Sequence, residues 1–152
     1  MQSEPIPTAG VIQGSDHLLP VRVYYEDTDF TGVVYHANYL RYFERGRSDF
    51  LRLCGVSHTE LRARQTPIVF VVRRMEVDFI QPARIDDALV VRTGYGRVNG
   101  PRIHIDQAIE RAGQTVAKAA VEVVCIRLDG RPVKPPADIL QALRLETPLQ
   151  AS

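Results

Sequence analysis

One long helical pattern, followed by strand patterns over most of the remaining chain, constrains the fold more than any other feature. Residues 36–54 carry apolar side chains at helical spacing, and Gly55 stands where a glycine commonly ends a helix. Gly46 falls on the apolar stripe of this helix, where a glycine costs about 1 kcal/mol relative to alanine. We therefore expect Gly46 to permit close approach to a neighbouring element.

Alternating apolar and polar residues predict a series of strands. The strand patterns cover residues 21–25, 68–79, 88–98, 103–110 and 115–128. Two short helical segments are predicted as well, at residues 58–64 and 137–145. A long helix combined with a meander of strands predicts an α+β fold in which the helix packs on an antiparallel sheet.

The length and composition indicate one globular domain. The chain has 152 residues and is 45% hydrophobic, enough to bury a core of its own. Residues 1–16 contain prolines and glycines without apolar periodicity, which predicts a flexible N-terminal arm. We expect a single domain over residues 17–146 and a C-terminal tail over residues 147–152.

Charge and hydropathy exclude several classes of protein. The 19 basic and 18 acidic residues leave a net charge of +1, which argues against a nucleic-acid partner. No apolar run approaches the roughly 20 residues of a membrane span. The polar, proline-containing opening segment does not resemble a secretory signal, and two cysteines are too few for a disulfide scaffold. We expect a cytoplasmic location.

Common motifs for phosphate binding, for a serine nucleophile and for zinc binding are missing from the sequence. There is no glycine-rich phosphate loop and no Gly-x-Ser-x-Gly elbow. The four histidines have neither helical spacing among themselves nor a cysteine pair beside them. We therefore expect neither a metal nor a redox cofactor.

An acidic loop directly precedes the long helix and is the main candidate for chemistry. It contains Glu26, Asp27, Asp29 and Gly32. Such a loop can be a solvated turn that interacts favourably with the helix dipole. Alternatively, a carboxylate near a helix N-terminus stays charged and acts as a base or nucleophile, while the free N–H groups of the first helical turn polarise a carbonyl oxygen.

The motif V-R-V-Y-Y-E-D-T-D-x-x-G-V-V-Y-H-x-N-Y, followed by F-E-R-x-R, favours the second interpretation. It resembles the hotdog-fold acyl-CoA thioesterases of the 4-hydroxybenzoyl-CoA thioesterase family, and most of all the branch associated with the bacterial Tol–Pal system. The likeness extends over residues 17–136. It implies a long central helix wrapped by a five- to six-stranded antiparallel sheet. It also implies homodimers or homotetramers with active sites at subunit interfaces.

The resemblance assigns catalytic roles to two residues. Asp29 matches the catalytic aspartate, as nucleophile or general base, and His36 matches the position whose backbone N–H faces the thioester carbonyl. The His36 side chain either caps or packs at the helix start, or forms a hydrogen bond with substrate or Asp29. A histidine at this position favours aliphatic acyl groups. The implied substrate is acyl-CoA, with acyl carrier protein as the alternative carrier of the acyl group, and coenzyme A belongs to the substrate.

Further residues are candidates for substrate binding. Tyr35, Asn38 and Tyr39 either line the acyl pocket or serve as core and capping residues. Because coenzyme A carries phosphates, basic side chains should bind it. The basic candidates are Arg73, Arg74, Arg97 and Lys134, with Arg102 and Arg131 as further possibilities.

Glu44 is the rival carboxylate, because another branch of hotdog thioesterases places its catalytic glutamate on the central helix. Arg41 and Arg47 stand at helical contact spacing from it, so a structural ion pair is the expected role.

Two other functions stay open at this stage. A hotdog dehydratase or hydratase is the alternative enzyme, although the histidine-containing motifs of those relatives are absent. A non-catalytic scaffold that binds acyl-CoA or acyl carrier protein is the alternative outside enzymes; it would tolerate the loss of Asp29.

Overall fold

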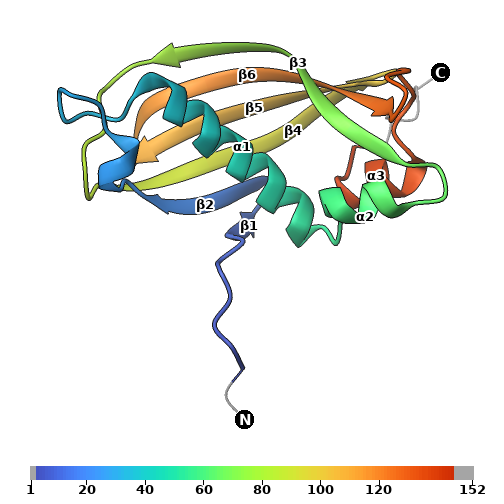
Figure 1. The fold of residues 1–152 in the computed structure, drawn as a ribbon, viewed down its shortest axis with the longest axis horizontal. Helices are drawn as coiled ribbons and strands as arrows, with labels where there is room; N and C mark the ends of the chain where they lie inside the picture. The colour runs from blue at the N-terminus through green and yellow to red at the C-terminus, as the bar shows by residue number, and fades with distance from the viewer. Residues whose placement is uncertain (1–2, 146–152) are drawn as a thin grey trace.

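The computed structural model describes residues 3–145 and contains one sheet wrapped around one long helix (Figure 1). The six strands are antiparallel and follow the order β1-β2-β4-β5-β6-β3. The elements are β1 Val11–Gln13, β2 Asp16–Arg22, α1 His36–Leu53, α2 His58–Ala63, β3 Ile68–Phe79, β4 Ala88–Asn99, β5 Arg102–Arg111, β6 Gln114–Arg127 and α3 Ala137–Ala142. This arrangement confirms the predicted α+β hotdog fold.

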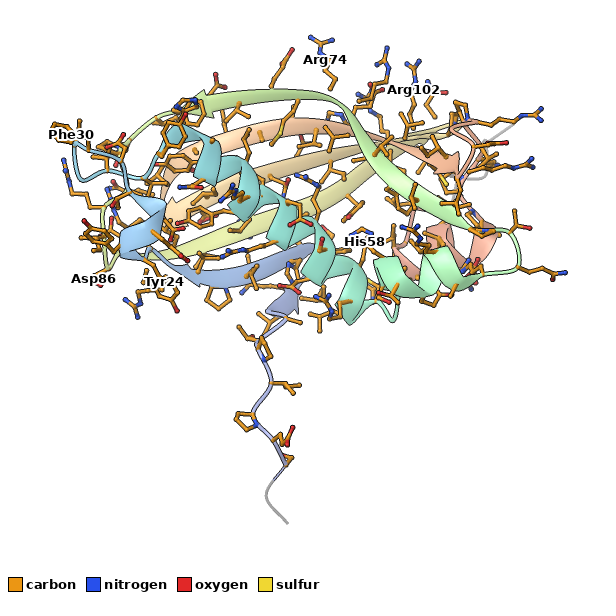
Figure 2. All side chains as sticks on the ribbon, in the orientation of Figure 1. Tyr24, Phe30, His58, Arg74, Asp86 and Arg102 are labelled. Atoms are coloured by element: carbon orange, nitrogen blue, oxygen red, sulfur yellow. The ribbon has the colours of Figure 1, made fainter. Side chains whose placement is uncertain are left out.

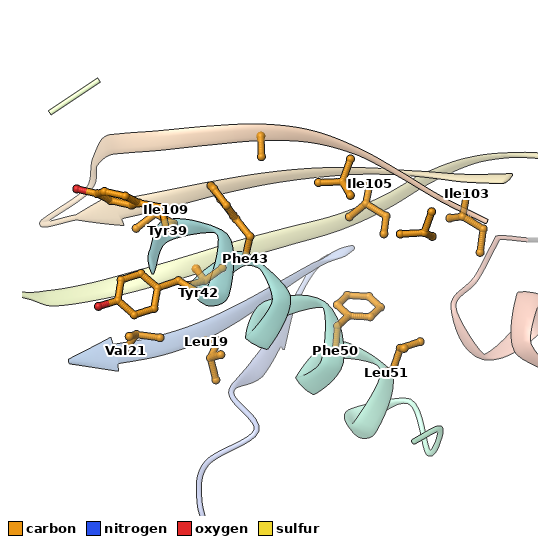
Figure 3. Packing of buried hydrophobic residues seen from close by; sticks show 14 of the residues in the cluster. Leu19, Val21, Tyr39, Tyr42, Phe43, Phe50, Leu51, Ile103, Ile105 and Ile109 are labelled. Atoms are coloured by element: carbon orange, nitrogen blue, oxygen red, sulfur yellow. The ribbon is translucent and has the colours of Figure 1, made fainter. Parts of the chain in front are cut away.

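The core lies between α1 and the concave face of the sheet (Figure 3). From the helix, Tyr42, Phe43 and Phe50 are buried, and the sheet contributes Ile105 and Ile109 among others. Fully burying one such side chain stabilises a fold by about 1.5–3 kcal/mol. The sheet thus covers the face of α1 that carries Tyr42, Phe43 and Phe50, whereas Leu40 and Leu53 on the same helix are exposed.

Gly46 brings α1 and the sheet into close contact, as its position on the apolar stripe predicts. A Cβ atom at this residue would lie 2.7 Å from Thr93 Oγ1 and 2.8 Å from Val91 Cγ1. Both neighbours belong to β4. A larger residue would therefore push the helix away from the sheet at its midpoint.

The N-terminal part of the sheet differs from the prediction. The expected strand over residues 21–25 is wrong in its boundaries, because β2 ends at Arg22 and Tyr25–Asp27 forms a short 3₁₀ helix. The expected arm over residues 1–16 also contains an ordered part, since β1 pairs with β2. All three residues of β1 are exposed, so backbone pairing rather than apolar burial defines this strand and leaves no periodicity in the sequence.

The two ends of the chain, residues 1–2 and 146–152, lie outside the described residues. The predicted C-terminal tail, residues 147–152, falls within the second of these segments. Within the described part, no helix is both long and apolar enough to cross a membrane.

Candidate active site

The acidic loop before α1 is a tight turn. Asp29 N–H donates to Val33 O at 2.8 Å, and Gly32 N–H donates to Asp29 O at 3.0 Å. Gly32 has a φ of +82°, a conformation that glycine adopts without the steric penalty of a side chain. These bonds leave Phe30 fully exposed at the tip of the loop, at the far left of the molecule in Figure 2.

The Asp29 carboxylate is exposed and held by its neighbour. Thr31 donates two hydrogen bonds to Asp29 Oδ1, one from its N–H at 2.8 Å and one from its hydroxyl at 2.6 Å. The side-chain bond from Thr31 and then its backbone bond lower the pKa of Asp29 below its ordinary value, and the nearby His36 contributes in the same direction. Asp29 is therefore an anion at neutral pH.

The N-terminus of α1 presents free backbone donors. His36 is its first residue, and the preceding Tyr35 makes no side-chain cap bond. Asn38 N–H donates to Tyr35 O at 2.8 Å, whereas the N–H groups of His36 and Ala37 have no hydrogen-bond partner within residues 3–145. Such N–H groups, together with the positive end of the helix dipole, can stabilise an oxyanion.

Asp29 and His36 line one open cavity of about 320 Å³. The other lining residues come from the same loop, from α1 and from the end of β3: Val33, Val34, Tyr39, Phe79, Ile80, Gln81 and Pro82. Sequence reasoning missed the four residues from Phe79 to Pro82. They are distant in sequence from the acidic loop, and the only signal was a pair of apolar residues at a predicted strand end.

Aromatic side chains surround the helix start. The His36 ring lies edge-on to Tyr35, with centroids 4.5 Å apart, and to Phe79 at 6.2 Å. Tyr39 packs against Phe79 at 5.5 Å, and its buried hydroxyl accepts a hydrogen bond from Ala83 N–H at 3.0 Å. Burial raises the pKa of Tyr39. Tyr39 thus supplies an apolar wall, while its hydroxyl holds the loop after β3.

Asn38 and Tyr35 lie beside the cavity but are not among its lining residues. Asn38 is buried, and its side-chain amide donates to Asp27 O at 2.8 Å, which ties the acidic loop to α1. Tyr35 contacts the His36 ring and is half-exposed. Their roles in substrate binding stay predictions.

The basic residues that we expected at the coenzyme A phosphates lie elsewhere in the chain. Arg73 pairs with Glu122, and Arg74 pairs with Glu76. Arg97 lines a separate hollow, and neither it nor Lys134 lines the Asp29 cavity. Arg74 lies well away from the Phe30 tip of the acidic loop in Figure 2. A single chain therefore does not bring these cations to Asp29.

The prediction of an ion pair for Glu44 is wrong. Its carboxylate accepts a hydrogen bond from Ser48 Oγ at 2.7 Å, and within residues 3–145 it forms no ion pair with Arg41 or Arg47. Arg47 instead donates to Gln107 Oε1 at 2.9 Å, because its side chain points under the helix toward the sheet. Glu44 also does not line the Asp29 cavity.

The rest of the described chain shows neither a metal-binding cluster nor an activated thiol. Among the described residues, no three His, Cys, Asp or Glu side chains lie close enough together to hold a metal ion. Cys54 and Cys125 are free, and burial raises the pKa of both thiols, that of Cys125 to about 11. Neither thiol is an activated nucleophile at neutral pH.

Comparison with known proteins identifies the family of this chain. Residues 23–143 match the model of the thioesterase-like superfamily. The acyl-CoA thioesterase YbgC of Haemophilus influenzae is 41% identical over 124 residues, which are 81% of this chain and 90% of that protein. The acyl-CoA thioester hydrolase YbgC of Escherichia coli O6:H1 is 42% identical over 118 residues, 78% of this chain and 86% of that protein.

A solved structure shows the same fold at similar identity. The "Probable Thioesterase" from Bartonella henselae superposes with a TM-score of 0.78 and is 43% identical; the match covers 80% of this chain and 99% of that one. The family match, the similar sequences and the shared architecture all indicate the same family. This chain belongs to the thioesterase-like superfamily and has its hotdog fold.

Proposed function

We propose that this protein hydrolyses acyl-CoA thioesters to the free acid and coenzyme A, with Asp29 as nucleophile or general base. One observation carries the proposal. The anionic Asp29 carboxylate and the start of α1, where two backbone N–H groups have no partner within residues 3–145, line the same cavity. The names of the YbgC relatives support acyl-CoA as the substrate.

The chemistry requires few groups. The thioester carbonyl oxygen accepts hydrogen bonds from the first N–H groups of α1, beginning with His36, which stabilise the tetrahedral oxyanion. Asp29 either attacks the carbonyl carbon, so that a C–O bond forms and the C–S bond breaks, or removes a proton from an attacking water. The first route gives a mixed anhydride that water then cleaves. The thiol, with a pKa of about 8.5, leaves as thiolate without a strong general acid.

The decisive experiment replaces Asp29. We expect Asp29→Asn to lower kcat for thiol release from acyl-CoA by about 100-fold or more, because the amide is neither a base nor an effective nucleophile. Glu26→Gln is the matched control, since Glu26 is an exposed carboxylate of the same loop outside the cavity. Near-wild-type turnover in Asp29→Asn would contradict the proposal.

The same assay separates the alternative functions. Hydration of an enoyl thioester without thiol release would indicate the hydratase. Tight binding of acyl-CoA or acyl-carrier protein without any turnover would indicate the scaffold. A panel of aliphatic and aromatic acyl-CoAs tests the aliphatic preference that His36 implies.

A second variant tests the two roles of His36. His36→Ala keeps the backbone N–H and removes the imidazole. Unchanged kcat would restrict the role of His36 to its backbone donor and to packing on Tyr35 and Phe79. A fall in kcat with the fold intact would assign a catalytic role to the imidazole.

We further propose that a second copy of the chain completes the site, in a homodimer or homotetramer. Asp29 and Phe30 are exposed, the cavity is open, and Arg73, Arg74 and Arg97 do not line it within one chain. We expect charge reversal at Arg97 to raise KM for acyl-CoA, and light scattering to give at least a dimer. A fully active monomer would contradict this assembly. The cytoplasmic location and the Tol–Pal association stay predictions.

A further inference from the structure

The loop between β3 and β4, residues 80–87, forms one wall of the Asp29 cavity. The first three residues of this loop line the cavity directly. Figure 2 shows Asp86 of the loop at the same end of the molecule as Phe30, the tip of the acidic loop. Because this part of the wall belongs to neither strand, its position depends on the contacts that hold the loop.

The same loop supports the segment between Asp29 and α1. Val34 N–H donates to Ala83 O at 2.8 Å, and Val33 forms an isolated antiparallel bridge with Arg84. Val33 O in turn accepts the hydrogen bond from Asp29 N–H, at 2.8 Å. A displacement of the loop between β3 and β4 would therefore move both the cavity wall and the backbone that presents Asp29 to the start of α1.

One ion pair holds both ends of the loop between β3 and β4. Arg111, the last residue of β5, donates from Nη1 to Pro82 O at 2.9 Å and to Asp87 Oδ2 at 2.8 Å. Asp87 Oδ2 also accepts a hydrogen bond from Arg84 N–H, at 2.9 Å. Since β5 lies inside the sheet, between β4 and β6, a well-supported strand fixes the position of the loop.

The ion pair between Asp87 and Arg111 is partly sheltered from solvent. The two side chains are 26% and 32% exposed. Burial disfavours the charged form of Asp87, but the hydrogen bonds from Arg84 N–H and Arg111, together with the charge of Arg111, outweigh it and hold the pKa of Asp87 below its ordinary value. Hydrogen bonds between charged groups are stronger than neutral ones, so the pair is a strong restraint on the loop.

We propose that Arg111 and Asp87 are positioning residues of the thioesterase site, which hold the cavity wall and the backbone around Asp29 through the loop between β3 and β4. Neither residue lines the cavity. The inference rests on the proposed function, because it assigns the pair an effect on acyl-CoA turnover. A displacement of about 1 Å that originates far from the reacting atoms can lower a rate by about 100-fold, so a restraint of this kind matters for catalysis.

The first test is the steady-state kinetics of thiol release from acyl-CoA by Arg111→Gln and Asp87→Asn. We expect kcat to fall and KM to rise in both variants, with a loss in kcat/KM of about tenfold or more, because the loop can then shift. The double variant should lose about as much as the weaker single variant, since both residues act through one pair. If Arg111→Gln fails to fold, Asp87→Asn carries the comparison.

The ion pair between Arg92 and Glu110 provides a matched control. It joins β4 to β5 at 2.7 Å, with side chains 37% and 19% exposed, and Glu110 directly precedes Arg111. Within residues 3–145, neither Arg92 nor Glu110 makes a side-chain hydrogen bond to the loop between β3 and β4. Glu110→Gln should therefore lower the urea midpoint about as much as Arg111→Gln does, while kcat and KM stay unchanged.

Amide hydrogen exchange gives a second measurement that needs no turnover. The Val34 N–H, which is bonded to Ala83 O, should exchange about tenfold faster or more in Arg111→Gln than in the native chain, because the loop opens locally. In Glu110→Gln, the exchange rate of Val34 should match that of the native chain.

Three results would overturn the proposal: kinetics of Arg111→Gln and Asp87→Asn equal to those of Glu110→Gln, losses that add in full in the double variant, and unchanged exchange at Val34. Loss of turnover in Asp29→Asn, with native kinetics in Arg111→Gln, would contradict this inference alone. Native turnover in Asp29→Asn would contradict the proposed function, whereas faster exchange at Val34 would still support the restraint on the loop.

Discussion

Thr31 donates both its N–H and its hydroxyl to the same oxygen of Asp29, Oδ1, at 2.8 Å and 2.6 Å. This double contact fixes the orientation of the carboxylate on an otherwise exposed loop. Since both donors bind Oδ1, Oδ2 is the oxygen that can face a substrate in the cavity. Thr31 therefore acts as a positioning residue for Asp29.

Thr31→Val should lower kcat by about tenfold while KM changes little, because valine keeps the backbone bond and the shape but loses the hydroxyl donor. A hydrogen bond to a charged group is stronger than one between neutral groups, and here it also fixes the orientation of the carboxylate. Thr31→Ser restores the donor and should recover kcat. Equal activity of the valine and serine variants in steady-state assays would remove the hydroxyl from the mechanism.

The pH dependence of activity should follow the lowered pKa of Asp29. The charged form is required for catalysis and is stabilised by Thr31, so kcat/KM should fall only below the ordinary value of 3.8. The stability of the fold should change in the same direction. The free energy that the Asp29 carboxylate contributes to folding is present above its unfolded pKa and is lost as the pH falls through its folded pKa. In Thr31→Val, the acidic limb should move to higher pH. Circular dichroism at each pH must show folded protein, and a limb that does not move would contradict the role of Thr31.

Tyr39→Phe should destabilise the fold by about 1–3 kcal/mol, because the buried Ala83 N–H would lose the one acceptor that it has within residues 3–145. The loop that it holds follows Pro82 at the cavity wall, so a smaller rise in KM should accompany the loss. Urea unfolding measures the first effect. Tyr35→Phe is the control, since its half-exposed hydroxyl has no hydrogen-bond partner within residues 3–145 and its removal should change stability little.

Gly46→Ala should be destabilising by about 1–3 kcal/mol, although alanine favours helices by about 1 kcal/mol over glycine. The added Cβ would meet Thr93 Oγ1 at 2.7 Å and Val91 Cγ1 at 2.8 Å, well inside van der Waals contact. Arg41→Ala, on the exposed face of the same helix, should be neutral or slightly stabilising. A thermal midpoint at or above that of the native chain in Gly46→Ala would show that the helix can shift without cost.

The parts of the fold that the sequence predicted are those with a strong local pattern. The amphipathic stripe of α1 and the alternation in β4, β5 and β6 arise because each element buries one face, and the residues of that face are apolar. The edge strand β3 has the same alternation in sequence, although only Ile68 in it is buried. The β1–β2 hairpin escaped prediction because β1 is exposed on all three residues, and only its backbone bonds to β2 define it. Pairing of this kind leaves no trace in hydrophobic periodicity.

The residues of the candidate site divide in the same way, into those with a local sequence signal and those without one. Asp29 and His36 lie within one short stretch of chain. The acidic loop and the helix start made this stretch the candidate, and the resemblance to the hotdog thioesterases singled out the two residues. The wall from Phe79 to Pro82 depended on the tertiary structure. The wrapping of the sheet around α1 alone decides which distant side chains meet beside the helix, and it also turns Arg47 toward Gln107 rather than toward Glu44.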